Sequence, residues 1–204
     1  MKETQEKSLR WFIMMNSKIL AAIAVFSALT IALNQSPLKF PAPYLPFLYY
    51  QIWEIPIVVA FLLFGPITGA SVSIVNTAVL FVLFPGDLPA GPFYNLMAIL
   101  SMLIGIFGAH WLTNSINKEE KRVMPIVIAT LFGIVLRVIV MSFVNWAFMR
   151  YPYPFGFSAP EEFIIAILPF IAFFNASVAI YTIPAGYILA RAISRGIKTN
   201  MWSP

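Results

Sequence analysis

Six apolar stretches run along the chain, separated by clusters of proline, glycine or charged residues. They cover residues 17–33, 52–64, 67–84, 93–114, 123–148 and 163–193. Because a helix needs about 20 apolar residues to cross a bilayer, stretches of this kind are typical of membrane-spanning helices. The pattern predicts an all-α membrane protein, a bundle of six transmembrane helices in a single integral-membrane domain that covers residues 1–204.

The connections between these stretches also carry a signal. Residues 52–64 and 67–84 are joined by Gly65-Pro66, and because proline can begin a helix but not continue one, we expect a tight helical hairpin there. The segments 34–51, 85–91 and 149–160 are rich in proline and aromatic residues and unlike flexible Gly/Ser linkers. We therefore expect them to form ordered loops.

The composition agrees with a membrane protein. Hydrophobic residues make up 60% of the chain and charged residues 10%, whereas soluble proteins carry about 25% charged residues. A chain of 204 residues with this many spans leaves no room for a separate soluble catalytic module. The absence of cysteine excludes disulfides, thiolate catalysis and cysteine-ligated metals.

Basic residues are distributed unevenly. If both termini lie on one side of the membrane, ten of the 13 basic residues lie there, two (Lys39 and Arg150) lie opposite, and Arg137 lies inside a helix. The positive-inside rule then predicts cytoplasmic termini and external Pro/aromatic loops. The formal net charge of +5 is explained by orientation and not by nucleic-acid binding. The ten residues are Lys2, Lys7, Arg10, Lys18, Lys118, Lys121, Arg122, Arg191, Arg195 and Lys198.

Polar side chains at membrane depth are energetically expensive, so each is a candidate functional residue. The set consists of Glu54, Asn76, Asn95, Arg137, Asn145 and Asn175. Most of them fall in the outer half of the predicted bundle, which indicates a polar pocket that opens outward. Alternatively, the Asn side chains only bond neighbouring helices. Arg137 is better explained as a structural clamp on Glu54 or on a backbone carbonyl. His110 is isolated, and we expect no metal site.

The first outer loop reads FPAPYLPFLYYQ and continues as IWEIP. Its aromatic residues, Tyr44, Phe47, Tyr49, Tyr50 and Trp53, are compatible with an interfacial belt. The prolines favour a second interpretation, a stiff lid over a flat ligand that is held by stacking and a few polar groups. The sequence leaves both interpretations open.

Ala24, Ala28 and Ala32 form a stripe of small residues on the first helix. Small residues at a spacing of four let another helix approach closely. The partner is either a second protein or a helix of the same bundle.

Several enzyme classes are excluded by missing motifs. The chain has no GxxxxGK[ST] loop, no HExxH and no Ser/His/Asp set, so we predict neither an ATPase nor a hydrolase. No coupling carboxylate lies near the predicted midplane, which argues against self-powered transport.

The chain resembles the substrate-binding S components of energy-coupling factor (ECF) vitamin transporters, and most of all their riboflavin-binding members. The Ala stripe resembles the family's AxxxA surface. QIWEIPIVVAFLLFGPITG resembles the family pattern D-x-S-D-x-P followed by a hydrophobic helix and FGPxxG. The family's Asn is matched by Asn95 within residues 91–105, GPFYNLMAILSMLIG. The ends of the family's helices five and six resemble residues 141–154, MSFVNWAFMRYPYP, and 166–178, AILPFIAFFNASV. The similarity covers about residues 24–193.

This resemblance implies a six-helix bundle in the plasma membrane of a prokaryote, with cytoplasmic termini. A vitamin would bind from outside beneath the first outer loop, and the bundle would topple when a transmembrane coupling subunit and two ATPase subunits act on it. Ala24, Ala28 and Ala32 would dock on the coupling subunit. Asn145 resembles an Asn that hydrogen-bonds the flavin ring, and Asn95 and Asn175 match polar positions of the pocket.

The chain departs from the family at four positions. Val178 and Val75 stand where the family has Lys, and Gln51 and Glu54 stand at the acidic positions of D-x-S-D.

We therefore predict a substrate-binding subunit for riboflavin or a related flat vitamin, with no catalytic residue, catalytic cofactor or metal. Asn95, Asn145 and Asn175 would orient the vitamin, Trp53, Tyr50 and Phe47 would stack on it, and Glu54 would bond it or fix the loop, with Asn76 as a further polar candidate. Membrane lipid would surround the chain. The alternatives are an S component for thiamine, pantothenate, folate or a cobalamin precursor, and a non-transporting assembly or sensor subunit.

Overall fold

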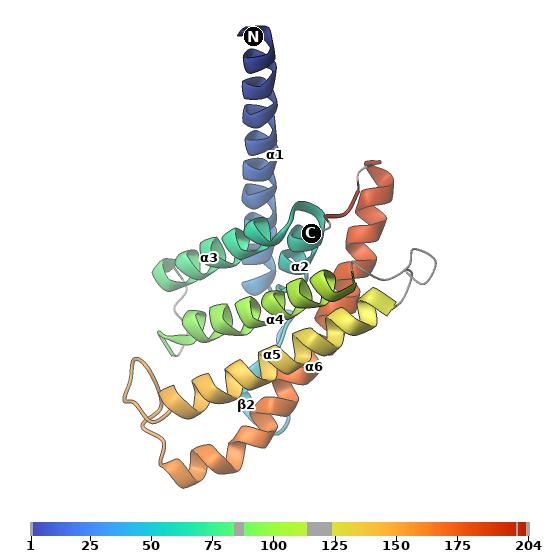
Figure 1. The fold of residues 1–204 in the computed structure, drawn as a ribbon. Coiled ribbons are helices and arrows are strands. Elements are labelled where there is room, and N and C mark those ends of the chain that lie inside the picture. Colours follow the sequence, from blue (N-terminus) through green and yellow to red (C-terminus); the bar gives the residue numbers. More distant parts are fainter. Residues whose placement is uncertain (1, 84–87, 114–123, 199, 203–204) are drawn as a thin grey trace.

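The computed structural model describes residues 2–83, 88–113, 124–198 and 200–202, with side chains described from residue 17 onward. Within these ranges the chain forms six helices and a two-stranded sheet (Figure 1). In chain order the elements are α1 (Lys2–Asn34), β1 (Phe40–Ala42), β2 (Leu45–Tyr50), α2 (Ile55–Phe64), α3 (Pro66–Leu83), α4 (Gly91–Thr113), α5 (Met124–Phe148) and α6 (Glu161–Gly196). The prediction of a six-helix all-α membrane protein is confirmed.

The helix ends follow the apolar pattern closely, with two informative differences. α1 begins at Lys2 and not at residue 17, because Lys, Glu, Gln and Leu favour helix although they are too polar for an apolar stretch. α2 begins at Ile55 and not at residue 52, because residues 52–54 form a bend and a turn. The predicted ends at 84, 114 and 123 lie outside the described residues.

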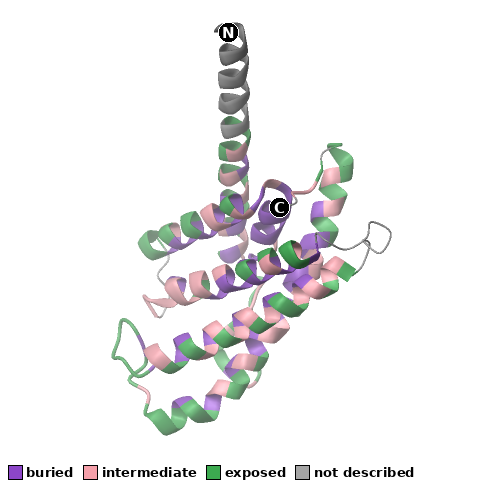
Figure 2. Ribbon diagram, in the orientation of Figure 1, coloured by how far each residue is buried: buried purple, intermediate pink, exposed green. Residues whose placement is uncertain are grey.

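α2 is much shorter than a membrane span. Five of the described helices are long and apolar enough to cross a bilayer, but α2 has only 10 residues. At 1.5 Å per residue it extends over about 15 Å, half of a hydrocarbon core of about 30 Å. It is apolar all round and buried along most of its length, as Figure 2 shows, which is typical of a helix at the centre of a bundle.

The turn after α2 has the predicted hairpin geometry. Gly65 has φ 97°, a conformation that favours glycine, and Pro66 begins α3. A Cβ at Gly65 would lie 3.0 Å from the Trp202 ring. The backbone N–H of Trp202 donates a hydrogen bond of 2.8 Å to the carbonyl of Leu62, in the last turn of α2. The segment after α6 therefore closes the end of the central helix.

Three helices, α1, α3 and α6, pack directly on α2. α1 packs on α2 and α3, α3 packs on α4, α4 on α5, α5 on α6, and α6 returns to α2. α4 and α5 approach closely at Gly105, where a Cβ would lie 2.5 Å from the carbonyl oxygen of Phe132. Many large apolar side chains on the outer faces are exposed, such as Val82 at 78% and Ile188 at 64% (Figure 2). Such faces suit lipid, and which end of the bundle faces the cytoplasm stays a prediction.

The first predicted loop contains a β-hairpin. β1 and β2 are antiparallel, with Phe40 opposite Tyr50 and Pro41 opposite Tyr49, and the register shifts after Pro41. Proline has no N–H for the ladder, so a short, irregular strand is expected there. The expectation of an ordered segment is correct, but the sequence analysis did not identify the strands.

Candidate ligand-binding site

A cavity of about 710 Å³ lies where the β-hairpin meets the helices. Its wall is formed by the end of α1, by β2 and the segment before α2, by Leu80 of α3, by the start of α4, by parts of α5 and α6, and by Phe157 between them. Ligand sites in proteins commonly measure about 300 to 1,000 Å³ and combine apolar walls with a few polar groups. The cavity has the size and composition of a small-molecule site.

Most of the candidate residues meet at this cavity. The wall contains Phe47, Trp53, Glu54, Asn95, Asn145 and Asn175. Two other candidates lie elsewhere. The Tyr50 hydroxyl is hydrogen-bonded to the hydroxyls of Tyr44 (2.5 Å) and Ser177 (2.8 Å). Asn76 is buried within α3, where its Oδ1 has no hydrogen-bond partner among the described residues. Three helices (α4, α5 and α6) and the segment 47–54 thus bring together side chains that are up to 128 positions apart in the chain.

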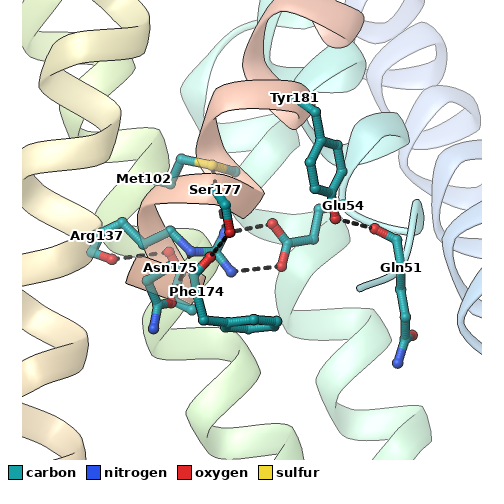
Figure 3. A network of polar contacts seen from close by, with 10 residues as sticks. Gln51, Glu54, Met102, Arg137, Phe174, Asn175, Ser177 and Tyr181 are labelled. Atoms are coloured by element: carbon teal, nitrogen blue, oxygen red, sulfur yellow. Dashed lines mark hydrogen bonds and ion pairs between the residues drawn. The ribbon is translucent and has the colours of Figure 1, made fainter. Parts of the chain in front are cut away.

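A buried ion pair forms part of the wall (Figure 3). Arg137 holds the Glu54 carboxylate with two N–H donors, at 2.5 Å from Nη1 to Oε2 and 2.9 Å from Nη2 to Oε1. Its Nε donates to Oδ1 of Asn175 at 3.0 Å, and Nη1 also contacts the Met102 sulfur at 3.6 Å. The two charged side chains are only 3% and 7% exposed. The structure therefore shows the Arg137 clamp on Glu54 that the sequence suggested, and both carboxylate oxygens are occupied.

The three candidate Asn residues differ in what they leave open to a ligand. Asn175 is largely engaged, because its Nδ2 donates to the Ile171 carbonyl at 2.9 Å and its Oδ1 accepts from Arg137. Asn145 donates Nδ2 to the Met141 carbonyl at 2.7 Å, and no described residue bonds its Oδ1. Asn95 is exposed on the wall, with no side-chain hydrogen bond to the part of the chain that the structure describes. Asn95 and Asn145 can thus contact a ligand directly, whereas Asn175 fixes the ion pair.

Aromatic side chains supply much of the apolar wall. Phe47 of β2 is 40% exposed and lies 5.8 Å from the Phe157 ring, centroid to centroid, so the hairpin meets the segment between α5 and α6. Trp53 and Phe174, both buried, also line the cavity. Such rings can pack against the faces of a flat ligand.

Other aromatic residues of the first loop anchor the hairpin. The Tyr44 ring lies 5.5 Å from Phe173, and the Tyr50 ring lies 4.9 Å from Phe174. Desolvation and the hydrogen bond to Tyr50 raise the pKa of the Tyr44 phenol to about 12, so it stays neutral near pH 7. The loop therefore contains both cavity-facing rings and rings that fasten it to α6.

Several wall residues were not candidates in the sequence analysis. Asn34 ends α1, Gln51 follows β2, and Lys39 lies between them in the chain. Tyr181 lines the cavity and donates its hydroxyl to the Gln51 carbonyl at 2.6 Å. Polar residues at the ends of apolar stretches look like ordinary loop residues. The available signal was the pair Asn34-Gln35 directly after an apolar run and ahead of the aromatic loop.

The Ala stripe of α1 faces away from the bundle. Ala24, Ala28 and Ala32 are all exposed, and their neighbours Val25 and Leu29 are 65% and 46% exposed. Of the two interpretations of the stripe, packing within the chain's own bundle does not apply to these residues. An apolar face with small side chains is left open to lipid or to another protein.

The chain was compared with protein families, with curated proteins and with solved structures. No protein-family profile matches the chain. The riboflavin transporter RibU of Staphylococcus aureus (strain TCH60) is 28% identical over 134 residues, which are 65% of this chain and 66% of that relative. The solved structure of the S component of a bacterial ECF transporter aligns with a TM-score of 0.68 and 26% identity, over 90% of this chain and 99% of that chain. S components are not enzymes. Both similarities support an S component of the ECF type, similar to RibU, as the family of this chain.

Proposed function

We propose that the chain is the substrate-binding subunit of an ECF-type vitamin uptake transporter and that riboflavin is its ligand. The observation that carries this proposal is the cavity of about 710 Å³, with aromatic and amide side chains on its wall, in a chain similar to RibU. The chain would act in a prokaryotic plasma membrane and pass the vitamin inward with a coupling subunit and two ATPases.

The charges on the wall favour a ligand without a positive charge. Glu54 is the only carboxylate among the described residues of the wall, and Arg137 neutralises it. Lys39 leaves the wall with a surplus positive charge. A cationic vitamin such as thiamine would find no free carboxylate there, whereas the uncharged flavin ring needs none. Electrostatics therefore supports riboflavin over thiamine.

Stacking and hydrogen bonding would together hold the ring. Phe47 and Trp53 would pack on its faces, with Tyr50 supporting Phe174 from behind the wall. Asn95 and the Oδ1 of Asn145 would bond its polar edge, because neither has a hydrogen-bond partner among the described residues. Nanomolar affinity corresponds to about 12 kcal/mol, which several such contacts and the burial of a large ring can supply.

The exposed Ala stripe would form the contact with the coupling subunit. Helices that associate inside a bilayer do so through small residues that permit close packing, and Ala24, Ala28 and Ala32 provide such a surface on α1. Because the stripe and the cavity use different residues, docking and ligand binding can be tested separately.

The direct test is identification of the small molecule that co-purifies with the chain, by mass spectrometry and absorbance. A yellow preparation with a flavin mass is expected. A different vitamin would show an S component of other specificity. The absence of any ligand in a broad vitamin screen, together with failure to capture a coupling subunit and an ATPase pair, would instead indicate a non-transporting membrane subunit.

A further inference from the structure

The C-terminal segment, residues 200–202, returns from the end of α6 to the end of α2 (Figure 1). Its Trp202 donates the backbone N–H to the Leu62 carbonyl at 2.8 Å. Leu62 is fully buried, and the residue four positions further on, Pro66, has no N–H to offer that carbonyl. Because a buried backbone carbonyl without a partner is costly, the C-terminal segment supplies a hydrogen bond that the α2–α3 turn cannot.

The Trp202 ring has a seat that consists of Phe61, Phe107 and His110. It stacks on two rings of α4, with centroids 6.0 Å from Phe107 and 6.1 Å from His110. It also meets Phe61 of α2 edge-on, at 5.9 Å between centroids. His110 is in turn hydrogen-bonded through Nε2 to the Tyr187 hydroxyl of α6. Trp202 therefore ties together α2, α4 and α6.

The central helix α2 connects this seat with the cavity. Trp53 and Glu54 of the cavity wall directly precede α2, and the backbone N–H groups of Ile57 and Val58 donate to the Glu54 carbonyl. The 10 residues of α2 extend over about 15 Å and are buried along most of their length. A short helix that is packed on all sides moves as one rigid element, so a shift at Leu62 displaces Trp53 and Glu54 as well.

We propose that the C-terminal segment is a latch that fixes α2 along its axis and thereby positions Trp53 and Glu54 for the ligand. Glu54 tolerates little displacement, because Arg137 holds its carboxylate with two N–H donors at 2.5 and 2.9 Å. The described residues of the latch and of its seat are not on the cavity wall, so the latch acts on the ligand only through α2. This inference rests on the proposed function, because it adds a control point to the site of that function.

The first measurement compares the purified full-length chain with its Trp202→Ala variant, by calorimetry and by the rate of riboflavin dissociation. The variant is expected to bind riboflavin roughly tenfold more weakly, which corresponds to about 1.4 kcal/mol, mainly through faster dissociation. Trp111→Ala is the matched control, because Trp111 also lies on α4 but is 71% exposed. Its affinity should stay within about twofold of that of the unaltered chain. A lower Tm for Trp202→Ala with unchanged affinity and dissociation rate would show a structural role alone and would overturn the proposal.

The second measurement uses the unaltered chain, so it decides the question even if Trp202→Ala fails to fold. Coupling between two sites is reciprocal, and riboflavin should hold the latch in its seat as strongly as the latch holds riboflavin. Exchange of the Trp202 amide hydrogen requires its bond to Leu62 to open, so saturating riboflavin should slow exchange in the C-terminal peptide about tenfold, measured by mass spectrometry. Unchanged exchange there, or equal slowing in every peptide of the chain, would overturn the latch.

The failure of the latch and the failure of the proposed function are distinguishable. An unaltered chain that binds no riboflavin would overturn the proposed function and the latch together. Normal riboflavin binding, with no effect of Trp202→Ala on affinity and no effect of riboflavin on exchange, would overturn the latch alone.

Discussion

Removing one charge of the Arg137–Glu54 pair should destabilise the bundle strongly. In Glu54→Leu the guanidinium stays in a site where it is 3% exposed, and in Arg137→Met the carboxylate stays 7% exposed. Removing one partner of a buried ion pair costs about 3 to 5 kcal/mol. At about 2 to 4 °C per kcal/mol for a chain of this length, each single variant should lower the Tm by roughly 6 to 20 °C in detergent, measured by intrinsic fluorescence.

The double variant, Glu54→Leu with Arg137→Met, tests whether the two residues are coupled. With both charges replaced by apolar side chains no buried charge is left, so the double variant should be more stable than either single variant. A double variant that loses the sum of the two single losses would show that the residues are not coupled. Arg150→Met is the matched control, because Arg150 is exposed and lies 4.0 Å from Glu161. Losing this exposed contact should cost no more than about 1 kcal/mol, so the Tm of Arg150→Met should fall by at most about 4 °C.

Three further predictions concern the cavity, the docking surface and the α2–α3 turn. Asn145→Ala and Trp53→Ala should each weaken binding of the co-purifying vitamin at least about tenfold by calorimetry, and unchanged affinity in both would contradict the assignment of the cavity. Ala28→Trp should abolish co-purification with the coupling subunit while vitamin affinity is retained, because Ala28 is exposed on α1; an intact complex would show that the stripe is not the docking surface. Gly65→Ala should lower stability by about 1 to 3 kcal/mol in thermal unfolding, since φ is 97° and the added Cβ would lie 3.0 Å from Trp202; wild-type stability would contradict this account.

The fold was largely predictable because the bilayer imposes a simple pattern on sequence. Apolar length defined the helices, and Gly65-Pro66 defined the α2–α3 turn. The hairpin was not predictable in the same way, because Pro41 and the aromatic run obscure the alternation of a strand. The extension of α1 to Lys2 was missed because helix formation does not require apolar residues.

The candidate site was predictable only where polar residues interrupt apolar stretches. Glu54 and Asn145 are conspicuous for that reason, and both line the cavity. Asn34 and Gln51 flank a loop in which polar residues are common, so the sequence does not distinguish them. Tyr50 shows a second limit of predicting the site from sequence. Tyr49 lines the cavity, whereas the hydroxyl of its neighbour Tyr50 bonds Ser177 of α6, and the sequence does not distinguish these two roles.

The shortness of α2 accounts for the existence of the cavity. A spanning helix at the centre of the bundle would need about 15 Å more than the 10 residues of α2 provide. A helix segment about 15 Å long and 10 Å wide occupies on the order of 1,000 Å³, and the cavity of about 710 Å³ begins at Trp53 and Glu54, directly ahead of α2. The ligand would thus take the place of the missing turns of the central helix, so that an empty S component is a bundle with an incomplete core and a loaded one has its core filled.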